Sequence, residues 1–203
     1  MYESLLQRVQ NGYLYFNLGN SYFRLGQVGS AILNYRRAEK FTPRFENLLN
    51  NLKHSRQKTK DKVEDKGYAP LLNNIFFLYR LLNLKEMLII FLVLNLILFL
   101  TAILHLYVKA DAVKWALFLV LGFYLISGAT AAVRFYNDRI QHEGVVIADE
   151  VWIRSGDGVN NIVLFALHEG AEFKVDEVKG DWLRISLADG NRGWTQRMGV
   201  EII

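Results

Sequence analysis

Two long uncharged stretches dominate the hydrophobic pattern of the 203-residue chain. Residues 87–108 contain no charged side chain over 22 positions, and residues 115–133 contain none over 19. A helix that crosses a bilayer needs about 20 predominantly apolar residues, and it pairs its backbone N–H and C=O groups internally. The pattern therefore predicts two membrane-spanning helices joined by a charged connection over 109–114. Buried core helices of a soluble protein are the alternative.

A second pattern lies nearer the N-terminus, where two runs of apolar side chains at helical spacing are separated by a glycine-containing break. The stretch 12–45 is 34 residues long, and 34 residues is the period of the tetratricopeptide repeat, a pair of antiparallel helices. The matching positions are Tyr15, Leu18, Gly19, Tyr22, Ala31, Tyr35, Ala38 and Pro43. We expect a helical repeat region over 1–66, with partial flanking helices on both sides and an array that begins before Met1.

The repeat register gives candidate binding residues, because tetratricopeptide repeats hold peptides against the concave face of their first helices. These candidates are Tyr13, Phe16, Asn20, Phe23, Arg24, Asn50 and His54. The amides of Asn20 and Asn50 can hydrogen-bond an extended peptide backbone, and Arg24 can pair with a carboxylate. The alternative is that these side chains face solvent or pack the helices of a short scaffold.

Between the repeat region and the first span, residues 67–86 are expected to form a linker and an interfacial helix. Residues 71–84 are apolar with few polar interruptions, but 14 residues are too few to cross a bilayer. A helix of this kind lies in the headgroup layer. The alternative is a core helix packed under the repeats.

From residue 144 to residue 203 the spacing changes to short alternating runs divided by turn residues. The pairs Lys179-Gly180 and Asp189-Gly190 are turn signals between such runs. This pattern predicts a small all-β antiparallel barrel of about five strands. A domain of this size buries little apolar surface, so we expect its tryptophans to contribute to the core.

This C-terminal region is similar to bacterial SH3 domains. The resemblance rests on 151–156, 167–170, 180–185, Asp189-Gly190 and Gly193-Trp194. It implies an SH3-like barrel that binds peptides or cell-wall material. The candidate contacts are Trp152, Trp182 and Trp194, with the alternative that Trp182 and Trp194 fill the barrel.

Charge is distributed unevenly along the chain. The net charges of residues 1–67, 68–139 and 140–203 are +6, +3 and −5, which gives the whole chain +4. No segment combines clustered basic and aromatic side chains in a nucleic-acid-binding motif, so we expect no nucleic-acid partner. The two outer flanks of the spans hold four basic residues and the connection holds two, a weak preference for cytoplasmic ends. Two spans in any case place both water-soluble parts on the same side.

Catalytic motifs are absent from the sequence. The chain has no cysteine, which excludes disulfides and thiol chemistry, and it has no HExxH, P-loop or GxSxG motif. His142-Glu143 and His168-Glu169 are expected to be linker and turn residues. We therefore predict no catalytic residues, no metal and no cofactor. The prediction is a membrane-anchored scaffold for protein partners in contact with membrane lipid, with a peptidoglycan-binding sensor as the alternative.

The complete order of parts resembles that of the BatE-type proteins of bacterial aerotolerance operons: a helical repeat, an interfacial helix, a two-span hairpin and an SH3-like barrel. The most specific part of the resemblance is the pair of runs 15–20 and 31–38. It implies a multidomain protein of the bacterial inner membrane with periplasmic soluble parts. It also implies von Willebrand factor A-type Bat proteins and a MoxR-type ATPase as partners, a role in stress response and no known catalytic activity.

Overall fold

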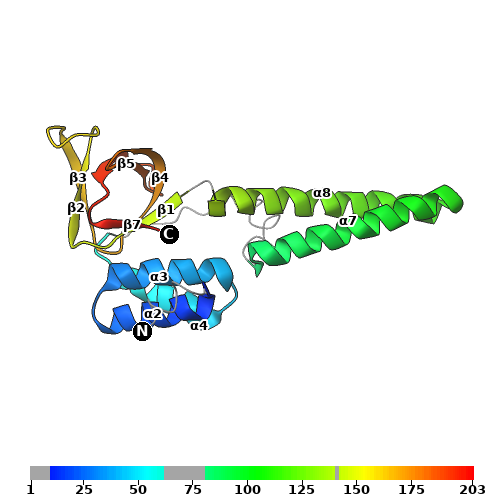
Figure 1. Cartoon of the computed structure of the whole chain (residues 1–203), viewed down its shortest axis with the longest axis horizontal. Coiled ribbons are helices and arrows are strands. Elements are labelled where there is room, and N and C mark those ends of the chain that lie inside the picture. The colour runs from blue at the N-terminus through cyan, green and yellow to red at the C-terminus, as the bar shows by residue number, and fades with distance from the viewer. Residues whose placement is uncertain (1–9, 62–80, 140–141) are drawn as a thin grey trace. The chain divides into compact units, whose positions relative to one another are not determined.

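The computed structural model describes residues 10–61, 81–139 and 142–203, which belong to two compact units (Figure 1). One unit combines the N-terminal helices with the C-terminal sheet, and the other contains two long apolar helices. The predicted helix before residue 10 and most of the predicted interfacial helix lie outside the described residues.

Within residues 10–61 the structure has three helices: α2 (Gly12–Arg24), α3 (Val28–Phe41) and α4 (Glu46–Lys58). The side chain of Asn11 caps α2 by accepting a hydrogen bond from the backbone N–H of Tyr13 at 2.8 Å. Gly26, with φ +80°, turns the chain between α2 and α3, a conformation that glycine adopts without steric cost. The predicted helix, glycine break and second helix are confirmed.

The two long helices are α7 (Leu84–Tyr107) and α8 (Asp111–Arg139). Each is long and apolar enough to cross a membrane, and little of either apolar window is buried. α7 begins before the uncharged stretch because Asn83 and Glu86 form a reciprocal capping box, with both hydrogen bonds at 2.9 Å. The predicted pair of long apolar helices is confirmed; α7 extends into the charged flank at its N-terminal end, and α8 does so at both ends.

The C-terminal part is one antiparallel sheet in the order β3-β2-β6-β5-β4-β1-β7. Its strands are β1 (His142–Val146), β2 (Glu150–Arg154), β3 (Val163–His168), β4 (Glu172–Lys179), β5 (Trp182–Ser186), β6 (Arg192–Gln196) and β7 (Val200–Ile202). The predicted antiparallel β region is confirmed, but the expected number of about five strands is wrong. The turn at Gly180, with φ +58°, joins β4 to β5 as predicted.

The helical part and the sheet pack against each other through α3 and β1 (Figure 1). Val145 of β1 is fully buried in the cluster of apolar side chains that α3 and α4 build. The backbone N–H of Gly29 in α3 donates to Glu169 at 2.8 Å, beside the turn that follows β3. The prediction that His142-Glu143 is a linker is wrong, because these residues begin β1.

Ion pairs cross the same interface. Arg36 of α3 pairs with Glu143 of β1 and, through Nε, with Glu172 of β4 at 3.2 Å. Arg56 of α4 binds Glu172 with two hydrogen bonds, of 2.6 and 2.8 Å. Burial alone would raise the pKa of Glu172, but the Arg56 hydrogen bonds and the charges of Arg36 and Arg56 hold that pKa below its usual range. The sheet therefore covers the α3 side of the N-terminal helices.

Candidate functional site

The N-terminal helices enclose a hollow between α2 and α4, with a volume of about 400 Å³. The helices α2 and α3 approach each other closely next to this hollow. A Cβ atom on Gly19 would lie 2.6 Å from a ring carbon of Tyr35, so only glycine lets the Tyr35 ring lie against α2 at this point. The lining residues are Asn20, Phe23, Arg24, Tyr35, Asn51 and His54.

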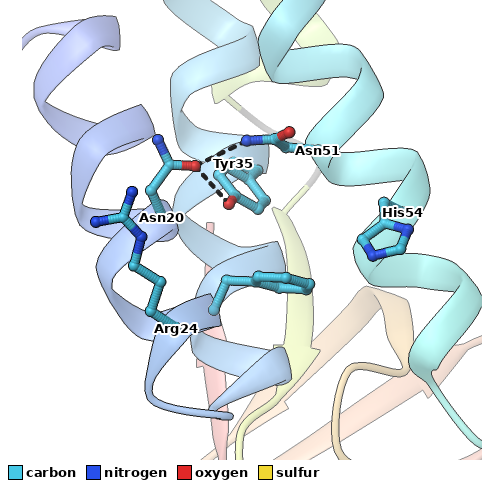
Figure 2. A pocket seen from close by; sticks show the side chains of 6 residues that line it. Asn20, Arg24, Tyr35, Asn51 and His54 are labelled. Atoms are coloured by element: carbon cyan, nitrogen blue, oxygen red, sulfur yellow. Dashed lines mark hydrogen bonds between the residues drawn. The ribbon is translucent and has the colours of Figure 1, made fainter.

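Two protein hydrogen bonds orient the amide of Asn20. The Tyr35 hydroxyl and the Asn51 side-chain N–H both donate to Asn20 Oδ1, each at 2.8 Å, and converge on that oxygen in Figure 2. Burial raises the pKa of the Tyr35 phenol, against the lowering effects of Asn51 and Arg24, so the hydroxyl keeps its proton for this bond. With Oδ1 occupied, the Asn20 amide nitrogen, which points away from both donors, can donate to a ligand.

Two basic side chains lie at or next to the lining of the hollow. Arg24 lies beside Asn20 on α2 (Figure 2). Lys58 of α4 places Nζ 4.5 Å from the centre of the Phe23 ring, a cation–π contact. The rings of Phe23 and His54 have their centres 5.6 Å apart. No carboxylate lines the hollow among the described residues. The arrangement suits an anionic group on a segment that also offers backbone carbonyl oxygens.

The structure brings together four of the seven residues that the repeat register predicted: Asn20, Phe23, Arg24 and His54. The other first-helix candidates, Tyr13 and Phe16, instead pack their rings on Phe45, with centres 5.3 and 4.9 Å apart. Tyr13 remains largely exposed. These two residues help hold α4 in place and do not line the hollow.

The amide that α4 contributes to the hollow is Asn51, whereas the register pointed to Asn50. Asn50 is exposed. Asn51 lies three residues after Leu48 and four before Ser55, both fully buried, so it shares the face that α4 turns toward α2. Leu49 is apolar but exposed, so hydrophobicity alone does not show which face of α4 is turned toward α2.

The tryptophans of the sheet lie outside its core. The core cluster contains Val146, Val151, Ile153, Leu167, Ala171, Phe173, Leu183, Ile185, Leu187 and Val200. Leu183 and Ile185 of β5 belong to the core, and successive side chains of a strand point to opposite faces, so Trp182 lies on the face of β5 away from the core. The expectation that tryptophans contribute to the core, and the alternative in which Trp182 and Trp194 fill it, are therefore wrong.

Instead, the tryptophans share one face with arginines. Trp194 of β6 is directly opposite Arg184 of β5 and Arg154 of β2. Directly opposite residues in an antiparallel pair point to the same side. Trp152, two residues before Arg154, belongs to this face and is 54% exposed. Of the three tryptophans, Trp152 offers the most accessible surface.

Comparison with known proteins gives a partial similarity to an amidase-named protein. No protein-family model matches the chain. A segment of 54 residues, 27% of this chain, is 33% identical to a protein of Bacillus subtilis (strain 168), YrvJ, whose name designates it an N-acetylmuramoyl-L-alanine amidase. The match spans only one tenth of the length of that protein.

Proposed function

We propose that this protein is a membrane-anchored scaffold whose helical repeat binds acidic, extended segments of partner proteins. The observation that supports this most directly is the oriented amide of Asn20, held by Tyr35 and Asn51 beside Arg24. A donor fixed before binding loses little conformational freedom when a ligand arrives. The role is binding without catalysis.

The anchor in this proposal is the pair α7 and α8, inserted as a hairpin with both soluble parts on the same side of the membrane. Their length and composition support insertion. The resemblance to BatE-type proteins extends the proposal to a bacterial inner-membrane protein with periplasmic soluble parts and an SH3-like C-terminal barrel. Its partners in that case are von Willebrand factor A-type Bat proteins and a MoxR-type ATPase system.

A peptide titration tests the hollow. The full chain in detergent micelles is titrated against a fluorescein-labelled Gly-Ser-Ala peptide that carries three glutamates, and against the same peptide with three glutamines. Fluorescence anisotropy should rise for the glutamate peptide at concentrations at which the glutamine peptide stays free. Equal binding of both peptides, or binding of neither, contradicts the proposal.

A matched pair of charge reversals locates the binding. Arg24→Glu changes the hollow, whereas Lys53→Glu makes the same charge change at an exposed position of α4 that does not line it. The first variant should weaken binding of the glutamate peptide at least ten-fold, and the second should change it less than three-fold. Equal losses of affinity in the two variants would indicate general electrostatic attraction and would contradict the hollow as the peptide-binding site.

A second candidate function is binding of peptidoglycan by the sheet. The partial similarity to a protein named as an amidase and the exposure of Trp152 favour it. The full chain in detergent should pellet with purified cell-wall sacculi. Trp152→Ala should reduce the pelleted fraction several-fold, and Trp115→Ala, which removes an exposed tryptophan of α8, should not. Absence of pelleting by the unmodified chain excludes this candidate.

A further inference from the structure

One side of α7 faces α8 with a regular spacing. Phe91 stacks on Tyr124 of α8 with ring centres 4.7 Å apart, and a Cβ on Gly128 would lie 3.0 Å from the Phe91 ring. Phe91 belongs to a set of α7 residues that follow one another at intervals of alternately four and three positions: Met87, Phe91, Leu94, Leu98, Thr101 and His105. All six are buried or half-buried. This set is the covered side of α7, and Phe91 places it against α8.

A second set with the same spacing lies one position further along the chain. It comprises Leu88, Leu92, Asn95, Phe99, Ala102 and Leu106. Five of the six are exposed, with Leu92 at 65% and Phe99 at 62%. Spacing of four and three residues is the heptad pattern with which helices pack side by side. We call this set the outer seam.

Asn95 is the one polar residue of the outer seam, and it lies at the middle of α7. At about 1.5 Å per residue, it is roughly 16 Å from Leu84 and 18 Å from Tyr107 along the helix axis. Its side chain makes a single hydrogen bond within the described residues, from Nδ2 to the Tyr124 hydroxyl at a long 3.4 Å. Its Oδ1 accepts none there. An amide left in this state at mid-bilayer depth is unfavourable.

We propose that the outer seam is a dimer interface, in which α7 of one copy packs in parallel against α7 of a second copy and the two Asn95 amides hydrogen-bond each other. This inference rests on the membrane insertion proposed above. The second Nδ2 hydrogen of each Asn95 then donates to Oδ1 of the other, while the first keeps Tyr124. Each amide is satisfied without moving the hairpin.

A second copy fits this surface better than an unrelated helix. Copies of one chain insert in the same direction, so their α7 helices are parallel and their Asn95 residues lie at the same depth. An amide is both donor and acceptor, so it complements its own symmetry mate. A single asparagine in an apolar heptad seam is also a known means of setting register and oligomeric state. Amide pairs between membrane helices contribute to association.

Cysteine crosslinking tests the geometry, and the chain lends itself to it because it contains no cysteine. The full chain is reconstituted into phosphatidylcholine vesicles, and insertion is established first by flotation and by resistance to alkaline extraction. Leu92→Cys and Phe99→Cys in the outer seam should form disulfide-linked dimers on mild oxidation. Val93→Cys and Ile97→Cys are the controls, because they are exposed but lie about 160° from Asn95 around the helix.

Substitution of Asn95 tests the chemistry. Resonance energy transfer between donor- and acceptor-labelled copies in the same vesicles should show a dimer. Asn95→Leu should weaken it about three- to thirty-fold, the range that interhelical hydrogen bonds produce, and Asn95→Gln should retain it. A chain that inserts but stays monomeric, crosslinks best at Val93 and Ile97, or loses nothing in Asn95→Leu overturns the dimer alone. A chain that does not insert overturns both the dimer and the membrane anchor.

Discussion

Arg36 of α3 and Glu143 of β1 form an ion pair although 107 positions separate them in the sequence. Their contact belongs to a wider arrangement in which Arg37 reaches Glu201, and Arg56 reaches Glu172. The basic N-terminal segment and the acidic C-terminal segment therefore neutralise part of each other's charge within one compact unit. The uneven charge along the chain is explained largely by this interface, so it is weak evidence for anionic partners.

We expect the pair Arg36–Glu143 to be strongly coupled. The two side chains are only 23% and 33% exposed. Removing Arg36 leaves Glu143 as a largely desolvated charge, whereas removing Glu143 leaves Arg36 with Glu39 and Glu172. Arg36→Met should therefore lower the free energy of unfolding by about 2–4 kcal/mol, somewhat less than for a fully buried pair, and Glu143→Gln should lower it by about 1–2 kcal/mol. The double variant should lose less than the sum. Urea unfolding in detergent, followed by tryptophan fluorescence, measures all three.

Glu201→Gln is the control for this cycle, because it removes the pair with Arg37 and leaves the hydrogen bond from Arg37 to the Ile202 carbonyl oxygen in place. Arg37 pairs with Glu201 at 3.0 Å, but Glu201 is about half exposed, so solvent screens the pair. Its loss should cost about 1 kcal/mol or less. Additive effects of Arg36→Met and Glu143→Gln would contradict the coupling.

Glu172 should make the stability of the helix and sheet unit depend on acid. Its pKa in the folded state is held below the ordinary value of 4.5 despite burial, so its contribution is present above about pH 4.5 and is lost as pH falls through the lower folded-state pKa. Thermal unfolding from pH 3 to 7, measured by near-UV circular dichroism, should show a smaller acid-induced drop for Glu172→Gln than for the unmodified chain. Glu177→Gln, at an exposed pair with Arg184, should leave the drop unchanged.

Gly29→Ala should destabilise the unit, although alanine normally favours a helix by about 1 kcal/mol over glycine. A Cβ at this position would lie 2.4 Å from the Val146 carbonyl oxygen, which is backbone and cannot rotate away. We expect a loss of about 1–3 kcal/mol in the free energy of unfolding. Ser30→Ala, the neighbouring change in α3, should have little effect. A stabilised Gly29→Ala variant would mean that α3 does not pack on the sheet as described.

Asn50 and Asn51 should differ sharply despite being neighbours. Asn51→Ala removes a hydrogen bond to Asn20 Oδ1 and should lower the free energy of unfolding by about 1 kcal/mol. It should also weaken binding of the glutamate peptide. Asn50→Ala changes an exposed residue and should stay within about 0.5 kcal/mol. Chemical denaturation of the two variants side by side decides it. A larger loss of unfolding free energy in Asn50→Ala than in Asn51→Ala would support the repeat register that places Asn50 in the hollow.

The kind of structure in each region could be predicted from the amino-acid sequence, although the number of strands and the strand at His142 could not. Uncharged length was enough to predict α7 and α8, and alternation with glycine turns was enough to predict β4, β5 and β6. These signals are local, because the formation of a helix or a hairpin depends on residues only a few positions apart. The same local reading found Asn20, Phe23, Arg24 and His54, since a repeat register places side chains relative to their own helix.

The contacts between segments that are distant in the sequence became visible in the folded chain alone. The choice of Asn51 over Asn50 depended on which face α4 turns toward α2, and a single position rotates a helical residue by about 100°. The outward position of Trp182 depended on the strand register. The packing of α3 on β1 was decided by Val145, by Gly29 and by glutamates that pair with Arg36 from two different strands. Such contacts join residues more than a hundred positions apart. Burial and charge in the folded chain determine which residues pair, and the spacing of residues within one helix or strand contains no information about these pairings.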